Sequence, residues 1–261
     1  MFAQPTAPGK PTAEPGPGDV IAQQIRNLII DTANNAPRSR QRRIGPSEVG
    51  NPCDRALAYK SLDWPTAPGA DREPWASVQG TAIHTWMAEL FEQRDPTGER
   101  YLVEQRVTVH QGYTEDATIA GSADLYDRLT GTVYDWKAVS PNSLAKYQRH
   151  GPGDQYRIQA NLYGLGMENA GETPKRVAIV FLPRQYRLEP YVWVDEYRRD
   201  VALAAVERLL QIRTRLSAVD LEAEPARFAE FATSPDAKCF FCDWHQRGTA
   251  DLGKSCPGHT P

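Results

Sequence analysis

The stretch from Gly121-Ser-Ala-Asp124 to Asp135-Trp136-Lys137 is predicted to form a β-hairpin that turns near Thr130-Gly131. Side chains alternate between faces along a strand, so Asp135 and Lys137 point the same way and Asp124 can face them from the partner strand. Two carboxylates this close repel each other unless a cation lies between them, and oxygen ligands favour Mg²⁺ or Mn²⁺. The alternative is an ordinary solvated strand face with a surface ion pair.

The segments around this hairpin have the apolar periodicity of an α/β protein. Strands are predicted near residues 101–110, 117–127, 131–139, 176–182 and 186–194. Helices are predicted near residues 76–94, 154–170 and 196–216. We therefore expect a central mixed sheet flanked by helices.

Composition narrows the class of protein. The chain has 261 residues and a formal net charge of −3, so a nucleic-acid-binding surface would have to be local. No window of about 18 apolar residues predicts a membrane helix, and the N-terminus lacks an apolar signal core. We expect a cytoplasmic protein without a membrane partner. In that compartment its four cysteines are expected to be metal ligands or free thiols rather than disulfides.

The order of segments predicts four regions. Residues 1–19 form a flexible tail rich in Pro and Gly, and residues 20–75 form an N-terminal helical region that holds Cys53. Residues 76–220 form the core, and residues 221–261 form a C-terminal region that holds the other cysteines. We expect the two cysteine-bearing regions to pack together as a cap on the core.

The cysteine pattern suggests a metal site. Cys239-Phe-Phe-Cys242 places two sulfurs close enough for one metal, and Cys256 follows. A closed thiolate site needs four ligands, and Cys53 is the remaining cysteine. In one alternative, His245 or His259 completes a Cys₃His zinc site. In another, the cysteines are unrelated.

Two further patterns have both a structural and a functional interpretation. Gln155, Gln159 and Tyr163 recur every four residues and share one helix face, which is either exposed or aimed at a substrate backbone. His84 lies near the apolar face of the helix predicted at 76–94, either as a core residue or as a ligand.

Taken together, these residues resemble the RecB-like branch of the PD-(D/E)XK nucleases, in particular members with an iron–sulfur cluster. Such members include CRISPR spacer-acquisition exonucleases, the AddB nuclease domain and related phage exonucleases. The resemblance covers roughly residues 44–261. It lies in the order of the following residues: Gly80 and His84, Asp124, Asp135 and Lys137, Gln159 and Tyr163, and one early and three late cysteines.

The resemblance implies a restriction-endonuclease-like core and a role for each of these residues. His84, Asp124, Asp135 and the carbonyl of Trp136 would bind Mg²⁺ or Mn²⁺, and Lys137 would act on the attacking water and the phosphate. A [4Fe-4S] cluster with a structural role, or zinc in its place, would be held by Cys53, Cys239, Cys242 and Cys256. DNA would be held by Gln155, Gln159, Tyr163, Arg149, Arg157 and Lys146, with Gln159 favoured over Gln155 by its spacing from Tyr163.

The implied function is a metal-dependent DNA exonuclease in recombination, repair or CRISPR adaptation. Its partners would be single-stranded DNA or DNA ends, and a helicase or recombination protein. The alternatives are a non-catalytic or zinc-stapled DNA-binding module on a nuclease fold, and a structure-specific or sequence-specific endonuclease. We see no separate recognition domain in the sequence, which favours degradation from ends.

Overall fold

The computed structural model describes residues 16–36, 43–68 and 73–259. The strands are β1 (Tyr101–His110), β2 (Ile119–Asp127), β3 (Thr132–Val139), β4 (Arg176–Pro183) and β5 (Tyr191–Glu196). The helices are α1 (Pro17–Asn34), α2 (Pro46–Val49), α3 (Asp54–Ser61), α4 (Trp75–Arg94), α5 (Pro141–His150), α6 (Asp154–Asn169) and α7 (Arg199–Ser217). Two 3₁₀ turns, η1 (Pro225–Glu230) and η2 (Cys239–Phe241), lie in the C-terminal region.

The predicted mixed sheet is confirmed. Its five strands follow chain order, β1-β2-β3-β4-β5. Neighbouring strands are antiparallel except β3 and β4, which are parallel. A parallel pair needs a crossover connection, and α5 and α6 supply it.

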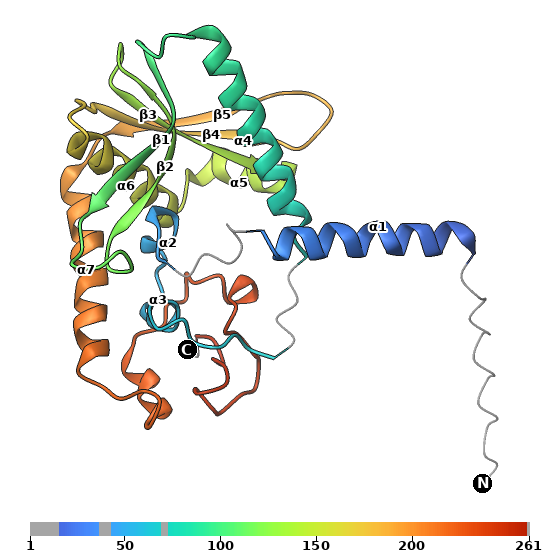
Figure 1. Ribbon diagram of the computed structural model, residues 1–261, viewed down its shortest axis with the longest axis vertical. Helices are drawn as coiled ribbons and strands as arrows, with labels where there is room; N and C mark the ends of the chain where they lie inside the picture. The colour runs from blue at the N-terminus through green and yellow to red at the C-terminus, as the bar shows by residue number, and fades with distance from the viewer. Residues whose placement is uncertain (1–15, 37–42, 69–72, 260–261) are drawn as a thin grey trace.

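Helices cover both faces of this sheet (Figure 1). α6 packs on one face and is itself covered by α7, whereas α4 packs on the other face. On the α4 face, Trp136 stacks on Phe91 with ring centroids 5.8 Å apart. On the α6 face, buried side chains of β3 and β4 such as Val133 and Ile179 join the core around Tyr163. The α/β fold class is therefore as predicted.

The connection between α5 and α6 explains why Lys146 and Gln159 lie on separate helices. Gly151 has φ of 70°, a left-handed value that favours glycine, and Pro152 follows it. The sequence predicts that the helix over 143–170 is broken or loosened at this point, and the structure confirms two helices.

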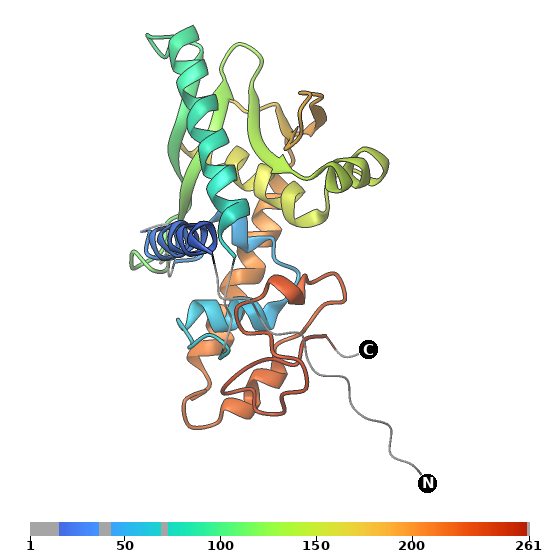
Figure 2. The ribbon, with the colours of Figure 1, turned by 90° about the vertical axis from the view of Figure 1, so that its right-hand side faces the viewer.

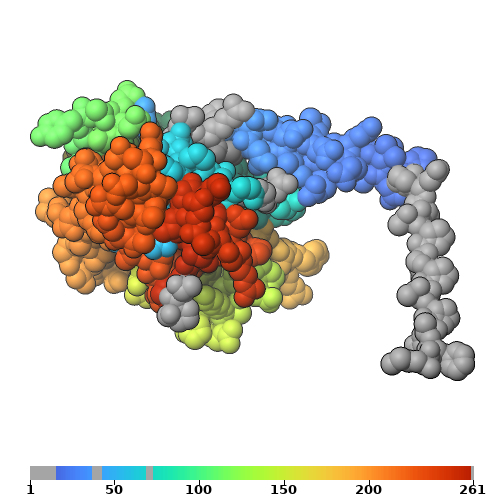
Figure 3. Space-filling view, turned by 90° about the horizontal axis from the view of Figure 1, so that it is seen from below, coloured from blue at the N-terminus to red at the C-terminus, as the bar shows by residue number. Residues whose placement is uncertain are grey.

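The part of the predicted N-terminal region that holds Cys53 packs against the C-terminal region below the sheet (Figures 1 and 3), whereas α1 of the same region projects from the body. The Tyr59 ring lies 4.0 Å from that of Phe228 and 5.6 Å from that of Trp244, measured between centroids. The Tyr59 hydroxyl donates to the Leu252 carbonyl at 2.7 Å, and the Trp64 indole donates to the Gly253 carbonyl at 2.8 Å. We call this unit, residues 43–68 with 221–259, the cap.

Helix α1 projects sideways from the body (Figure 1). It begins at Pro17, inside the region predicted as tail, while tail residues 1–15 lie outside the described residues. Its apolar side chains Ile21, Ile25 and Leu28 are exposed, and Arg26 pairs with Glu73 at 2.6 Å. Of the helices in the described residues, none combines the length and the apolar character needed to cross a bilayer.

Candidate active site

The predicted hairpin opens where the candidate active site begins. β2 and β3 pair from Asp127↔Thr132 to Leu125↔Tyr134 and no further. Beyond this point the buried Asp124 side chain pairs with β3 in place of the β2 backbone, because its Oδ2 accepts the Trp136 backbone N–H at 2.7 Å. A side-chain carboxylate thus replaces a backbone acceptor and is fixed in place by the strand that it faces.

His84 approaches Asp124 from helix α4. Its Nδ1 lies 3.3 Å from Asp124 Oδ1, and its Nε2 lies 3.1 Å from the Trp136 carbonyl oxygen. Burial lowers the pKa of His84, but the hydrogen bond and negative charge of Asp124 outweigh it, and the net pKa is raised. The predicted ligands His84, Asp124 and the Trp136 carbonyl are therefore together.

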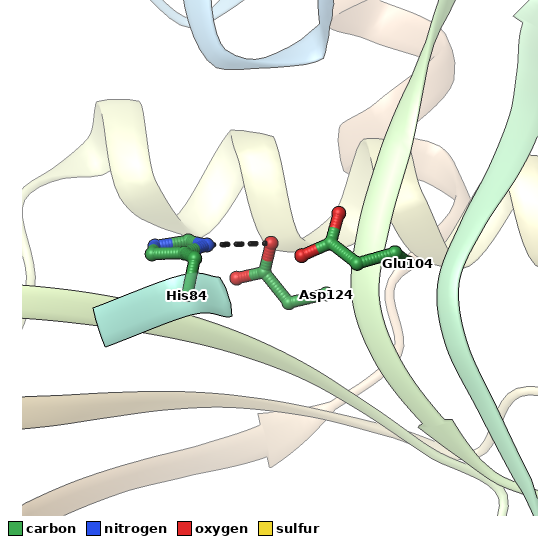
Figure 4. A group of neighbouring side chains, drawn as sticks. All are labelled: His84, Glu104 and Asp124. Atoms are coloured by element: carbon green, nitrogen blue, oxygen red, sulfur yellow. Dashed lines mark ion pairs between the residues drawn. The ribbon is translucent and has the colours of Figure 1, made fainter. Parts of the chain in front are cut away.

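Glu104 completes this group, and sequence reasoning missed it. One ligand atom each from His84, Glu104 and Asp124 lie within 4.8 Å of one another (Figure 4). Glu104 is exposed on β1, between Val103 and Gln105, which pair with Leu125 and Ala123 on β2. This antiparallel register places Glu104 opposite Asp124.

The backbone at Glu104 is unusual as well. Its φ is 46°, in the left-handed region that residues other than glycine seldom occupy. Such a conformation costs about 1–3 kcal/mol and is found mostly where surrounding structure imposes it, often at functional sites. The strained position brings a carboxylate to the Asp124 side of the sheet.

Asp135 and Lys137 form a second, adjacent pair on the α6 face. As predicted, they share a face, and Lys137 Nζ lies 2.6 Å from Asp135 Oδ2. Gln159 Nε2 donates to Asp135 Oδ1 at 2.8 Å. Burial raises the pKa of Asp135, Lys137 opposes this and Asp124 adds to it, so the net pKa is raised. Asp124 turns toward His84 and Glu104, and its charge and that of His84 still act on Asp135, so the two charged groups are neighbours.

The residues predicted to hold DNA have varied positions. Gln159 and Tyr163 are buried, and Gln155 donates to the Ser47 carbonyl at 3.1 Å. The Arg149 side chain donates to the Ala145 carbonyl, and that of Arg157 donates to the Pro152 carbonyl. In this conformation Gln159 orients a carboxylate, and a contact of any of these residues with DNA stays a prediction.

Lys146 lies near the cap. It is exposed on α5, close enough to Lys238 to interact with it electrostatically. Burial and then the charge of Lys146 lower the pKa of Lys238. Lys238 Nζ also lies 5.5 Å from the centroid of the Tyr156 ring. The cap and the crossover helices α5 and α6 therefore meet at this point.

The four cysteines gather in the cap. Cys53 Sγ accepts the Ala56 N–H at 3.4 Å, at the start of α3, and Cys256 Sγ accepts the Gly258 N–H at 3.4 Å. Burial raises the pKa of Cys53 and of Cys242, and the charges of the other cysteines contribute to both increases. The thiols from the two ends of the chain therefore lie within electrostatic range of one another.

The spacing of these sulfurs can be compared with that of known metal sites. Within the described parts of the chain, His84, Glu104 and Asp124 are the one group of three or more His, Cys, Asp or Glu ligand atoms that all lie within 4.8 Å. No three cysteine sulfurs are that close. Zn–S bonds of about 2.3 Å in a tetrahedron would hold sulfurs about 3.8 Å apart. The predicted alternative ligand His245 lies in the cap beside Cys239 and Gly258, and His259 Nδ1 lies 3.2 Å from the Thr233 hydroxyl.

Comparisons with known proteins identify no family for this chain. No family model matches the sequence, and no curated protein matches it. An alkaline exonuclease from Laribacter hongkongensis, LHK-Exo, superposes with a TM-score of 0.48 at 14% identity, over 74% of this chain and 96% of that chain. Its complex with dAMP gives 0.46 and 13%, over 74% and 95%. A phage-related exonuclease from Haemophilus somnus gives 0.40 and 12%, over 62% and 78%. At these values function has to be argued from the side chains.

Proposed function

We propose that this protein is a divalent-metal-dependent deoxyribonuclease of the PD-(D/E)XK class that degrades DNA from its ends. The observation that carries the proposal is the convergence of His84, Glu104 and Asp124 at the point where β2 and β3 separate. The Asp135–Lys137 pair lies directly beside it on β3. A nuclease site requires both metal ligands and a neighbouring positive charge, whereas an ordinary acidic surface requires no such lysine.

Mg²⁺ or Mn²⁺ fits this donor set. His84, Glu104, Asp124 and the Trp136 carbonyl would hold the ion, with Asp135 next to them. Carboxylate and carbonyl oxygens suit both Mg²⁺ and Mn²⁺. The imidazole ligand shifts the preference toward Mn²⁺, compared with a site made of oxygen ligands alone. A bound cation would lower the pKa of a water molecule and offset charge on the scissile phosphate.

The protein's own residues then orient the reaction. Lys137 Nζ is held between Asp135 Oδ2, at 2.6 Å, and the Tyr156 ring, 5.1 Å from its centroid. From there its ammonium stabilises the negative charge that develops on the phosphate and orients the attacking water. Gln159 fixes Asp135, which in turn fixes Lys137.

We also propose that Cys53, Cys239, Cys242 and Cys256 hold a [4Fe-4S] cluster with a structural role. The four thiols are within electrostatic range of one another, but no three of their sulfurs all lie within 4.8 Å. This spacing fits an iron–sulfur cluster better than a single zinc ion. Burial disfavours free thiolates at Cys53 and Cys242, so bound iron would supply the missing positive charge. The cluster would reinforce the aromatic contacts that already join the two halves of the cap.

The preference for DNA ends rests on what surrounds the site. The described residues make up one sheet, its covering helices, the projecting α1 and the cap, and none of these is a separate DNA-recognition module. We therefore propose single-stranded DNA or DNA ends as substrate, in recombination, repair or CRISPR adaptation. A helicase or recombination protein would supply unwound strands.

The test is digestion of end-labelled linear DNA by anaerobically purified protein with Mg²⁺ or Mn²⁺. The wild type should digest linear DNA and leave a covalently closed circle intact. Lys137→Ala should lower the rate by about 10²–10³-fold, the cost of removing one stabilising group in an active site.

A matched lysine provides the control. Lys175 is exposed and lies beside Gly131, at the β2–β3 turn away from the site. Lys175→Ala should digest DNA at the wild-type rate. Digestion of closed circles as fast as linear DNA would replace the exonuclease with an endonuclease, and no digestion of any DNA by folded protein would refute the proposal.

A further inference from the structure

Two large aromatic side chains of the cap face the solvent. Phe240 is 87% exposed and Phe241 is 71% exposed, and both lie between Cys239 and Cys242 in the turn η2. Their ring centroids are 5.1 Å apart and the rings are nearly perpendicular, at 88°. Isolated exposed apolar residues are common, but two adjacent exposed phenylalanines form a small aromatic surface that the core does not use.

This surface is connected to the candidate active site through one residue. Lys238, which directly precedes the turn, lies over the Tyr156 ring, and Lys137 lies over the same ring. The distances from the two Nζ atoms to the ring centroid are 5.5 Å and 5.1 Å. Figure 2 shows the C-terminal region below α5 and the start of α6, in agreement with these contacts. The aromatic turn therefore begins one side chain away from the Lys137 site.

Two positive charges lie next to this surface. Lys146 and Lys238 are exposed and close enough to interact, although the whole chain has a net charge of −3. Among the described residues, neither lysine has an ion-pair partner within 4.0 Å. Two neighbouring ammonium groups without an acidic partner would be stabilised by an anionic ligand.

We propose that Phe240 and Phe241, together with Lys238 and Lys146, form a binding site for single-stranded DNA on the cap. The rings would stack on unpaired bases, and the two ammonium groups would contact the backbone phosphates. The site would hold the strand whose phosphate lies at Lys137, so this inference rests on the proposed function. Single-stranded nucleic acid is favoured over a protein partner because its bases can stack on the rings and its phosphates supply regularly spaced negative charges.

The experiment measures binding of fluorescently labelled oligothymidine by anisotropy in EDTA, which prevents digestion. The double variant Phe240→Ala with Phe241→Ala should bind about tenfold more weakly or worse, because stacking contributes about 1–3 kcal/mol per base. Replacing both phenylalanines by tryptophan should retain binding. Tyr113→Ala, which removes an aromatic side chain that is 108% exposed in the β1–β2 loop, should leave binding unchanged.

A second arm removes the bases instead of the rings. An oligonucleotide with a run of abasic sites should bind the wild type about as weakly as oligothymidine binds the double alanine variant. Abasic sites should then weaken the double variant no further. Equal losses in both proteins would overturn the stacking site, and so would wild-type affinity in the double variant, which would leave the aromatic surface to a protein partner.

These outcomes can be separated from failure of the nuclease proposal. Normal digestion with unchanged binding in the double variant refutes the strand site alone. Binding that depends on the phenylalanines, without digestion of any DNA, refutes the nuclease and retains the strand site. If the double variant loses the visible absorption expected of the proposed cluster, the cap itself has been damaged. The single Phe240→Ala variant and the abasic oligonucleotides with wild-type protein then decide whether the rings bind DNA.

Discussion

The candidate active site and the cap both gather potential metal ligands, but they draw on the chain in different ways. Asp124, Asp135 and Lys137 lie within one hairpin, where alternation and register fix their positions. The cap joins Cys53 to Cys256, and its position depends on the two ends of the chain meeting. Local geometry places the three hairpin residues, to which α4 and β1 add His84 and Glu104, whereas the grouping of the cysteines depends wholly on long-range packing. Substitutions in the two regions should therefore change different properties.

The largest expected effect is in the cap. Cys53→Ser should abolish the broad visible absorption of the anaerobically purified protein, because a [4Fe-4S] cluster would lose one of four thiolate ligands. The melting temperature should fall by several degrees, since a loss of about 1 kcal/mol lowers it by roughly 2–4 °C for a chain of this size. Absorption and calorimetry measure the two effects. A colourless wild type that contains zinc would contradict the cluster assignment.

The next effect concerns a residue that acts through another. Gln159→Ala should lower the rate of DNA digestion by about 10–100-fold, as removal of hydrogen bonds behind metal-site carboxylates commonly does. The reason is that Asp135 loses the donor 2.8 Å from its Oδ1. Gln155→Ala is the matched control, one turn earlier on the same helix and bonded to Ser47 instead. Equal losses in the two variants would mean that Gln159 has no special relation to the site.

Metal binding should depend on pH through His84. The pKa of His84 is raised, so without metal its protonation stabilises the fold at low pH, and this stabilisation is lost as pH rises through the raised pKa. Mn²⁺ needs the neutral ring, so its affinity should fall about tenfold per pH unit below that pKa. Calorimetric titration with Mn²⁺ between pH 6 and pH 8 measures the slope. His84→Gln should flatten it, and an unchanged slope would remove His84 from the site.

The smallest effects test the strained residue. Glu104→Gln and Glu104→Gly should both weaken Mn²⁺ binding by about tenfold, because each removes one negative charge from a solvent-exposed position near the ion. The glycine variant should be more stable than the glutamine variant by about 1 kcal/mol, since glycine adopts a φ of 46° without a steric penalty. Chemical denaturation compares the two. Equal stability would show that this backbone conformation is not strained.

Much of the fold follows from the sequence. Alternating strands and helices with one apolar face predict the mixed sheet and its flanking helices. The positions of Asp135 and Lys137 on one face follow from the period of two. The sequence predicts the last strand too early, at 186–194, whereas β5 spans Tyr191–Glu196 because residues 184–190 form a turn and its approach. The packing of the Cys53 segment on the C-terminal region also follows, because a closed thiolate site needs four ligands and the chain has one early and three late cysteines. These features depend on patterns within single elements or on a simple count of residues.

The remaining features depend on contacts between elements. Glu104 is exposed on a strand, and only the β1–β2 register brings it to Asp124. Gln159 is buried and donates to Asp135, a contact that the pattern of its own helix does not show. Ile21, Ile25 and Leu28 recur at helical spacing, yet they are exposed because α1 projects from the body. A single helix or strand pattern shows which face is apolar but not which neighbour covers it.

The most direct test of the account is digestion of end-labelled linear DNA by Asp124→Asn beside the wild type, with Mn²⁺ and with EDTA. Asn can still accept the Trp136 N–H, so fold and colour should be unchanged while the carboxylate ligand is lost. We predict Mn²⁺-dependent digestion by the wild type, and a loss in the variant that exceeds the roughly 10–100-fold typical of residues behind a metal ligand. Digestion by Asp124→Asn at the wild-type rate, or equal digestion in EDTA, would contradict the proposed metal site and the nuclease mechanism that depends on it.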